Sequence, residues 1–207
     1  EGVDMEEKVL VENRFRSIVD GSEFRLDPKD DEDRWTFEQL GKKVPVKKLV
    51  ERMIVRSSNL ATNLLIEKAG PAAVTSLCRS LGAKEIQVLR GVEDSKAFKA
   101  GRNNVTSARD LMLLLEAIGT GRARGAKDMI DVLARQEFNS GVPAGVPAGT
   151  KVAHKTGSIT KIHHDAALVL PAGEKGYVLV VLTRGIADHD ESAKLIREVS
   201  RVVWESR

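Results

Sequence analysis

The spacing of apolar residues predicts a mainly helical first part of the chain and a stranded second part. Apolar residues recur every three to four positions in several stretches, which is typical of amphipathic helices. These stretches are 46–56, 59–69, 71–81, 107–118 and 126–137. Runs rich in β-branched and other apolar residues predict strands near 151–160, 165–170 and 176–184. A final amphipathic stretch predicts a helix over 190–205, and residues before about 35 predict an extended or irregular start.

This order of elements predicts an α+β fold. A mainly helical region over 1–140 precedes antiparallel strands over 141–207, which a terminal helix backs, and we expect one integrated domain. Residues 141–149 are rich in proline and glycine and predict the connector. The apolar run 177–182 predicts a strand that is covered on both faces and paired on both sides.

Composition excludes several classes of protein. The chain has 207 residues, 42% hydrophobic and 30% charged, enough to bury a sizeable core. The formal net charge of +3 comes from interspersed residues, and only 4% of residues are aromatic, so we expect no nucleic-acid partner. No run of about 18 apolar residues occurs, so no membrane span is expected. The acidic stretch 27–33 lacks the spacing of a calcium loop and predicts a solvated loop.

The cysteine and histidine residues indicate neither a disulfide nor a metal site. Cys78 is the single cysteine, and we expect it to be buried rather than to act as a nucleophile. His163, His164 and Asp165 are consecutive, and neighbouring residues of a strand point to opposite faces, so they do not easily share one zinc ion. We expect His164 and Asp165 to be structural, and His154 to point away from the face of Lys155.

Two short segments carry candidate chemistry. Ser57-Ser58-Asn59 lies between two predicted helices, where Ser-x-Asn on its own is commonly a helix cap. Lys155-Thr156-Gly157-Ser158 lies on a predicted strand. Gly157 lets a substrate backbone approach and leaves neighbouring N–H groups open to an oxyanion. Together the two segments indicate acyl transfer.

On these residues the chain resembles the penicillin-recognising serine hydrolases, most closely the class A β-lactamase-like group. The turn at 57–59 resembles the Ser-Asp-Asn segment of that family, with Ser58 where aspartate is usual. Residues 104–111 resemble the entry to the helix after the Ω-loop, and 154–158 resemble the Lys-Thr-Gly strand. The resemblance runs from about residue 4 to 204. It implies a β-lactamase/transpeptidase-like fold and no cofactor.

The resemblance also implies roles for individual residues. Ser57 relays a proton to the leaving group, and Lys155 assists through its positive field. Asn59 holds the substrate amide, while Thr156 and Ser158 bind a substrate carboxylate. The backbone N–H of Ser158 is one of two oxyanion donors.

The deacylation base is less clearly indicated. The family's Glu-x-x-Leu-Asn segment is absent, and Glu93 is the nearest candidate. The alternative is that Glu93 and Asp94 form a surface acidic pair in a loop. Without a base the acyl-enzyme is long-lived, which describes a penicillin-binding protein better than a resistance enzyme.

The nucleophile of the family lies in Ser-x-x-Lys on a helix, and no such helical motif is present. The one Ser-x-x-Lys, Ser158 to Lys161, overlaps the predicted strand, where residues three apart point to opposite faces. Two explanations stay open: residues 1–207 are the carboxy-terminal portion of a longer protein, which we favour, or the chain is a relative that has lost catalysis. We expect residues 1–207 alone to be inactive.

The leading functional hypothesis is a β-lactamase-like serine hydrolase that forms an acyl-enzyme on a serine outside residues 1–207. Its substrates are small β-lactams or related amides, esters and peptide-like compounds. The alternatives are a penicillin-binding-type DD-peptidase or esterase, and a non-catalytic protein that binds cell-wall peptides. The resemblance implies a periplasmic or secreted location, and neither the compartment nor the oligomeric state follows from the residues themselves.

Overall fold

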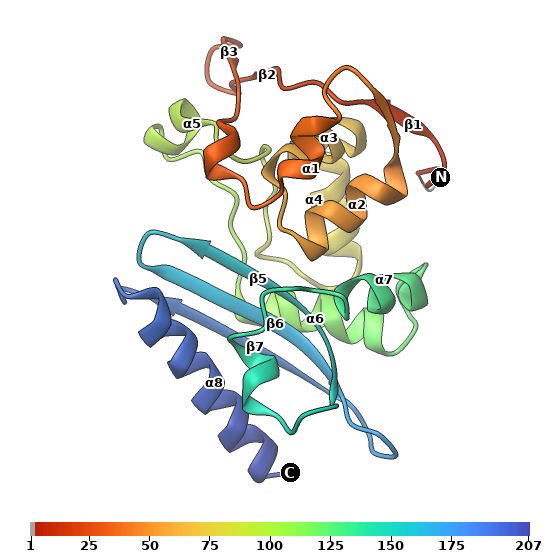
Figure 1. The fold of residues 1–207 in the computed structure, drawn as a ribbon, viewed down its shortest axis with the longest axis vertical. Coiled ribbons are helices and arrows are strands. Elements are labelled where there is room, and N and C mark those ends of the chain that lie inside the picture. The colour runs from red at the N-terminus through yellow and green to blue at the C-terminus, as the bar shows by residue number, and fades with distance from the viewer. Residues whose placement is uncertain (1–2) are drawn as a thin grey trace. The chain divides into compact units, whose positions relative to one another are not determined.

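The computed structural model describes residues 3–207, which fall into two compact units. The first unit comprises residues up to 80 together with 85–105, and the second comprises 81–84 and 106–207. Figure 1 labels the elements in chain order. Each unit has its own hydrophobic core.

The first unit is a group of helices edged by short strands. The strands β1 (Lys8–Leu10) and β4 (Lys43–Pro45) form one antiparallel pair, and β2 (Phe15–Arg16) and β3 (Glu23–Phe24) form another. The helical elements are η1 (Pro28–Asp30), α1 (Arg34–Glu38), α2 (Val46–Val55), α3 (Asn59–Ala69), α4 (Pro71–Ser80) and α5 (Ser95–Lys99). Their core is aliphatic, and Val11, Leu49 and Leu60 are fully buried in it.

The second unit is a three-stranded antiparallel sheet with helices on both faces (Figure 1). The strands β5 (Lys151–Ile159), β6 (Ile162–Leu170) and β7 (Tyr177–Arg184) lie in that order. Ile196 of α8 (His189–Glu205) and Val142 of η2 (Val142–Gly145) pack with Val169 on one face. The other face contacts α6 (Ala108–Gly119) so closely that a Cβ on Gly119 would lie 2.9 Å from a methyl of Leu168. The helix α7 (Ala126–Leu133) packs near β5.

Most of the predicted elements are confirmed. The predicted helices that begin at residues 46, 59 and 71 begin at those residues and end within one residue of the predicted position. The helix predicted over 126–137 ends earlier, at Leu133, and β6 begins at Ile162 rather than at residue 165. Within residues 3–207, β7 pairs with β6 alone, so pairing on both sides is not found in the described chain.

The predicted division into a helical region over 1–140 and a stranded region over 141–207, in one domain, stays a prediction. Compact units are defined by packing rather than by the type of secondary structure. In this chain α6 and α7 are helices that pack with the sheet.

Two expectations about individual residues were wrong. The acidic stretch 27–33 is not simply a solvated loop, because Asp31 and Asp33 are buried, at 8% and 1% exposure. Cys78 is half-buried rather than buried, although it lies three positions after the buried Thr75 on the same face of α4. Among the helices of residues 3–207, none is long and apolar enough to span a bilayer.

Candidate functional site

Ser57, Ser58 and Asn59 form the junction between α2 and α3, as predicted. Ser57 has a left-handed backbone with φ of 55°, which turns the chain sharply between the two helices. The buried Ser58 is the N-cap of α3, and its Oγ accepts the backbone N–H of Ala61 at 3.2 Å. The helix cap is therefore Ser58, the middle residue of the motif. Its neighbours Ser57 and Asn59 are not needed as the N-cap of α3.

The Asn59 carboxamide is held in one orientation by two acceptors. Its Nδ2 donates to the backbone oxygen of Asp30 at 3.2 Å and to Oε1 of Glu93 at 3.4 Å. Both partners are acceptors, so the amide nitrogen must face them. In the described part of the chain Oδ1 of Asn59 has no hydrogen-bond partner. This oxygen can therefore accept an N–H from a ligand.

Glu93 lies on a loop that is fixed on both sides. Asn63, buried on α3, accepts the N–H of Val92 at 2.6 Å and donates to its carbonyl oxygen at 3.0 Å. Asp94 caps α5 and accepts the N–H of Ile18 at 3.0 Å. Glu93 itself is exposed and has a left-handed backbone with φ of 63°. The loop therefore has a defined path while the Glu93 carboxylate faces solvent.

Gly91 allows the Asn63 carboxamide to lie close to the backbone of residues 91 and 92. A Cβ at Gly91 would overlap the carboxamide oxygen of Asn63. Only glycine leaves room for the contact between Asn63 and Val92, so the loop bearing Glu93 depends on the Gly91 and Asn63 pair.

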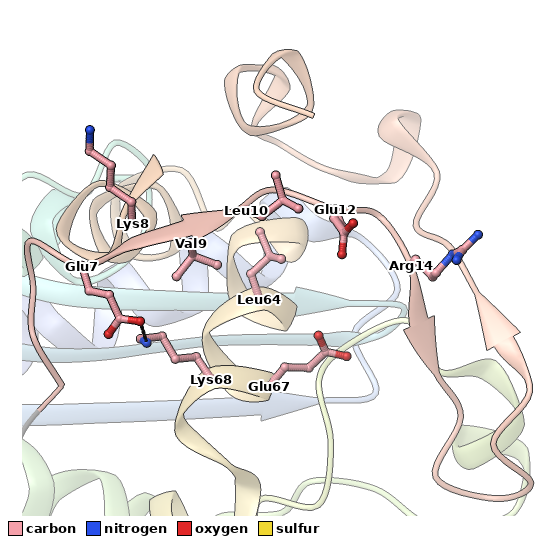
Figure 2. A pocket seen from close by; sticks show the side chains of 9 residues that line it. All are labelled: Glu7, Lys8, Val9, Leu10, Glu12, Arg14, Leu64, Glu67 and Lys68. Carbon is pink, nitrogen blue, oxygen red and sulfur yellow. Dashed lines mark ion pairs between the residues drawn. The ribbon is translucent and has the colours of Figure 1, made fainter. Parts of the chain in front are cut away.

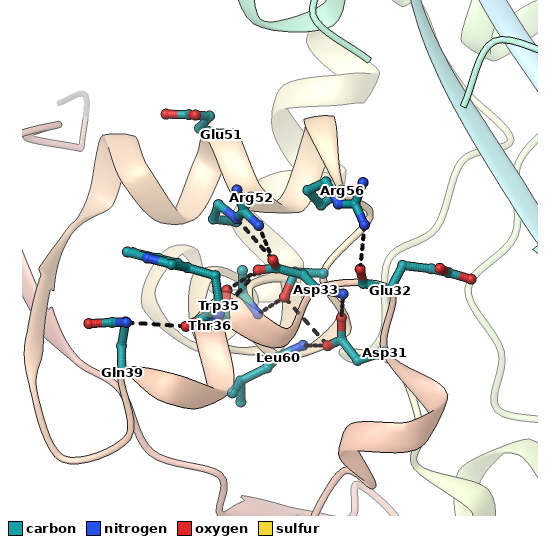
Figure 3. Close-up of polar contacts among 12 residues, drawn as sticks. Asp31, Glu32, Asp33, Trp35, Thr36, Gln39, Glu51, Arg52, Arg56 and Leu60 are labelled. Carbon is teal, nitrogen blue, oxygen red and sulfur yellow. Dashed lines mark hydrogen bonds and ion pairs between the residues drawn. The ribbon is translucent and has the colours of Figure 1, made fainter. Parts of the chain in front are cut away.

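The loop before α1 contributes two buried carboxylates to the same unit (Figure 3). Asp31 Oδ2 accepts the N–H of Leu60 at 2.9 Å, while Asp33 forms an ion pair with Arg52 of α2. Burial raises the pKa of Asp31 above its usual range, against the opposing N–H bonds of Leu60 and Asp33. Burial also acts to raise the pKa of Asp33, but hydrogen bonds from Arg52 and Thr36 outweigh it, and that pKa lies below its usual range.

In the second unit, Lys155, Thr156 and Ser158 lie on β5. Burial lowers the pKa of Lys155 to about 8, against the opposing field of Asp165. The Lys155 ammonium donates to the carbonyl oxygen of Thr156 at 2.6 Å. A Cβ on Gly157 would meet no atom of the described chain closer than 4.0 Å, so packing within the chain does not require glycine there.

Alternation along β5 separates the candidate side chains. The register of β5 with β6 is continuous from Lys151 to Ile159, so neighbouring residues point to opposite faces. Lys155 therefore lies on one face, and Thr156 and Ser158 lie on the other. Among the described strands β5 pairs with β6 alone, so a ligand reaching all three residues would lie along the outer edge of β5.

His154 points away from the face of Lys155, as predicted. It is 1% exposed, and its Nδ1 lies 2.9 Å from Oδ1 of Asp165. The other oxygen of Asp165 accepts the N–H of Val142 at 2.8 Å. The structural role predicted for Asp165 is therefore confirmed, although it lies inside β6 rather than at its start. In residues 3–207 no cluster of three or more His, Cys, Asp or Glu side chains has the arrangement of a metal site.

A hollow of about 310 Å³ in the first unit contains none of the candidate residues (Figure 2). Val9 and Leu64 contribute apolar surface to it, and Lys68 pairs with Glu7 at 2.6 Å. Burial, with the nearby Glu12 carboxylate, raises the pKa of Glu67. The lining of the hollow is therefore apolar and charged, and it includes no hydroxyl or amide side chain.

The structure thus brings Asn59 and Glu93 together in the first unit and keeps Lys155, Thr156 and Ser158 on one strand of the second. The meeting of these two groups in one site stays a prediction. Sequence reasoning missed Asn63 and Asp31. Asn63 lies four residues after Asn59, so it shares that face of α3, and a buried amide on an apolar helix needs partners. No comparable signal distinguishes Asp31 from its acidic neighbours.

Comparison with known proteins decides the family. The profile described as the β-lactamase enzyme family matches residues 19–206. The chain belongs to this family. Its class A β-lactamase-like character, and with it the α+β, β-lactamase/transpeptidase-like fold, is confirmed by similar proteins and solved structures.

Two relatives of this β-lactamase-family chain illustrate the similarity. A β-lactamase of Streptomyces fradiae is 30% identical over 181 residues, which cover 82% of this chain and 58% of the relative. The solved structure of PBP-A is 28% identical with a TM-score of 0.75, and the match covers 84% of this chain and 65% of PBP-A. The chain spans about half the length of the curated relatives that it matches.

Proposed function

We propose that the full-length protein containing this chain is a β-lactamase-like serine hydrolase that acts through an acyl-enzyme. Its substrates are β-lactams or related amides and esters, and its nucleophile is a serine outside residues 1–207. The observation that carries the proposal is the orientation of Asn59. Its amide nitrogen is occupied by Asp30 and Glu93, which leaves its oxygen to accept the side-chain amide N–H of a β-lactam.

In the acylation step the serine oxygen attacks the lactam carbonyl carbon. A carbon–oxygen bond forms, the carbon–nitrogen bond of the ring breaks, and the serine proton passes through the Ser57 hydroxyl to the leaving nitrogen. The Lys155 ammonium stabilises the negative charge that develops during this transfer. The backbone N–H of Ser158 donates to the carbonyl oxygen as it becomes an oxyanion, and the hydroxyls of Thr156 and Ser158 bind the substrate carboxylate.

In the deacylation step Glu93 takes a proton from water as the water oxygen attacks the ester carbonyl carbon. The carbon–oxygen bond to serine breaks, and the proton returns to the serine oxygen. The support for Glu93 is its position on a loop fixed by Asn63 and Asp94, within 3.4 Å of Asn59.

A second candidate function is a penicillin-binding DD-peptidase or esterase with slow deacylation. One observation favours slow deacylation over fast turnover, and another favours acylation over non-catalytic binding. Glu93 is exposed rather than enclosed, which gives a water molecule beside it little orientation. A variant of PBP-A that is 28% identical to this chain has been solved as an acyl-enzyme complex with penicillin G.

Nitrocefin hydrolysis by the full-length protein tests the proposal. Continuous turnover is the expected result for a β-lactamase, and a burst of one equivalent followed by slow release supports the second candidate. Absence of both turnover and a covalent adduct would contradict acylation and leave the protein as a binding module. Residues 1–207 alone are expected to give neither.

A further inference from the structure

The carboxylate of Asp31 lies directly against the turn that carries Ser57 and Asn59. One of its oxygens, Oδ2, accepts the N–H of Leu60 at 2.9 Å and the Ser58 hydroxyl at 3.4 Å. The other, Oδ1, accepts the N–H of Asp33 at 2.8 Å. Figure 3 shows this carboxylate facing the backbone of Leu60. The carboxyl group of Asp31 thus lies at the first turn of α3, where the helix dipole favours an acidic side chain.

The loop 30–33 bonds to both helices that flank the turn. On the side of α2, Arg52 pairs with Asp33, and Arg56 donates to the carbonyl oxygen of Glu32 at 3.0 Å. On the side of α3, Asn59 donates to the carbonyl oxygen of Asp30 at 3.2 Å. The loop therefore restrains the end of α2 and the beginning of α3 at once, so the turn between them has little freedom to move.

The identity of residue 58 suggests a role for the contact between Ser58 and Asp31. In the family that the chain resembles, an aspartate is usual at this position, and here the position holds a neutral serine. The serine hydroxyl still caps α3 through Ala61, but it supplies no charge. A carboxyl group nevertheless lies next to residue 58, because Asp31 accepts a hydrogen bond from the Ser58 hydroxyl. Asp31 is 27 residues away along the chain.

We propose that Asp31 is a positioning residue for Ser57 and Asn59, supplying from the preceding loop the carboxylate that the family usually carries within its Ser-Asp-Asn segment. This inference rests on the proposed function for its effect on acylation. Asp31 acts through the backbone of the turn, and it contacts neither the substrate nor the reacting atoms.

Replacing Asp31 with asparagine tests the inference in the full-length protein, because one oxygen becomes an amide that faces an N–H donor. We expect Asp31→Asn to lower the rate constant for acylation by nitrocefin about 10- to 100-fold, since small displacements of positioned groups have effects of this size. Glu32→Gln is the matched control. It removes the same charge from the adjacent, exposed residue, and its rate should stay within about twofold of the unmodified protein.

Ser58→Asp gives a result that a merely stabilising role for Asp31 would not produce. With Asp31 present, the new carboxylate would face the existing one, and acylation should fall. In the Asp31→Asn background the same substitution restores a carboxylate to the turn, and acylation should rise by at least fivefold. An effect of the same sign in both backgrounds would overturn the inference, as would full activity of Asp31→Asn.

Amide hydrogen exchange at Leu60 separates this inference from the proposed function. Exchange at Leu60 should accelerate in Asp31→Asn and slow again in the double variant, whether or not the protein is acylated. If Asp31→Asn does not fold, Ser58→Asp alone decides: unchanged or faster acylation would overturn the inference. An unmodified protein that is not acylated would contradict the proposed function, and Leu60 exchange would still test the contact.

Discussion

The amide nitrogen of Asn59 lies 3.4 Å from a carboxylate oxygen of Glu93. The two residues are 34 positions apart, and each is held independently, Asn59 by the carbonyl oxygen of Asp30 and Glu93 by its anchored loop. This contact makes Glu93 the carboxylate to test as the deacylation base.

Glu93→Gln should slow deacylation and leave acylation nearly unchanged. The amide cannot take a proton from water, and loss of a general base lowers a rate by about 10² to 10⁴-fold. Mass spectrometry of the full-length protein after mixing with penicillin G should show an adduct that persists longer in the variant. The exposed Glu38→Gln is the control. Equal adduct lifetimes in the two variants would show that Glu93 is not the base.

Lys155 should give acylation a pH dependence in the alkaline range. Its pKa lies at about 8, so the ammonium is present below that pH and is lost as the pH rises through it. The acylation rate constant should therefore fall above about pH 8. In Lys155→Arg the fall should disappear, because the guanidinium stays charged. A flat profile in the unmodified protein would mean that the charge of Lys155 has no part in acylation.

Lys155→Ala should lower acylation about 10²-fold or more, because it removes the positive field entirely. Circular dichroism should show an intact fold, because the substitution removes a charge whose burial is unfavourable. Lys151→Ala, at the exposed start of the same strand, is the matched control and should acylate normally.

Substitutions at Gly91 and Asn63 should have non-additive effects on the free energy of unfolding. Gly91→Ala places a methyl group against the Asn63 carboxamide and should lower the free energy of unfolding by about 1–3 kcal/mol. Asn63→Ala strands the N–H and carbonyl of Val92 and should have a cost of similar size. In the double variant the clash is absent, so its unfolding free energy, measured in urea, should be close to that of Asn63→Ala alone. Strict additivity would contradict the contact.

His163 should make the protein less stable in mild acid. Burial, with the positive field of the stacked His189 at 4.1 Å between ring centroids, lowers the pKa of His163 below its ordinary 6.5. The unfolded chain then binds more protons than the folded one, so stability is complete above about pH 6.5 and falls as the pH drops below it. His163→Gln should reduce this slope in urea unfolding measured from pH 5 to 7. An unchanged slope would exclude His163 as its source.

Long elements and the two motif segments followed from the sequence because each is encoded locally. The helix periodicity over 46–56 and 59–69 also located the turn at Ser57 between them. The strand predicted around Lys155 implied that alternate side chains point to opposite faces, and His154 is indeed buried on the face opposite to Lys155. The strands β1 to β4 and the five-residue helices α1 and α5 were missed, because elements of two to five residues carry too few apolar positions to show a period.

The role of the acidic stretch 27–33 could not be predicted, because its meaning lies in partners that are distant in sequence. Asp31 is buried against the N-terminus of α3, and Asp33 is buried against the Arg52 guanidinium. In the sequence they do not differ from Asp27 and Asp30, which are exposed. Asn63 was more accessible to reasoning, since a polar residue on the inner face of an apolar helix signals a partner.

The central claim is that Ser57 and Lys155 serve one reaction, and a double-mutant cycle on acylation of the full-length protein by nitrocefin tests it most directly. Ser57→Ala and Lys155→Ala should each lower the acylation rate constant about 10²-fold, and the double variant should lose little more than either one, because residues that act as a unit are not additive. Losses that multiply in full in the double variant, or an unmodified protein that is not acylated, would contradict the account.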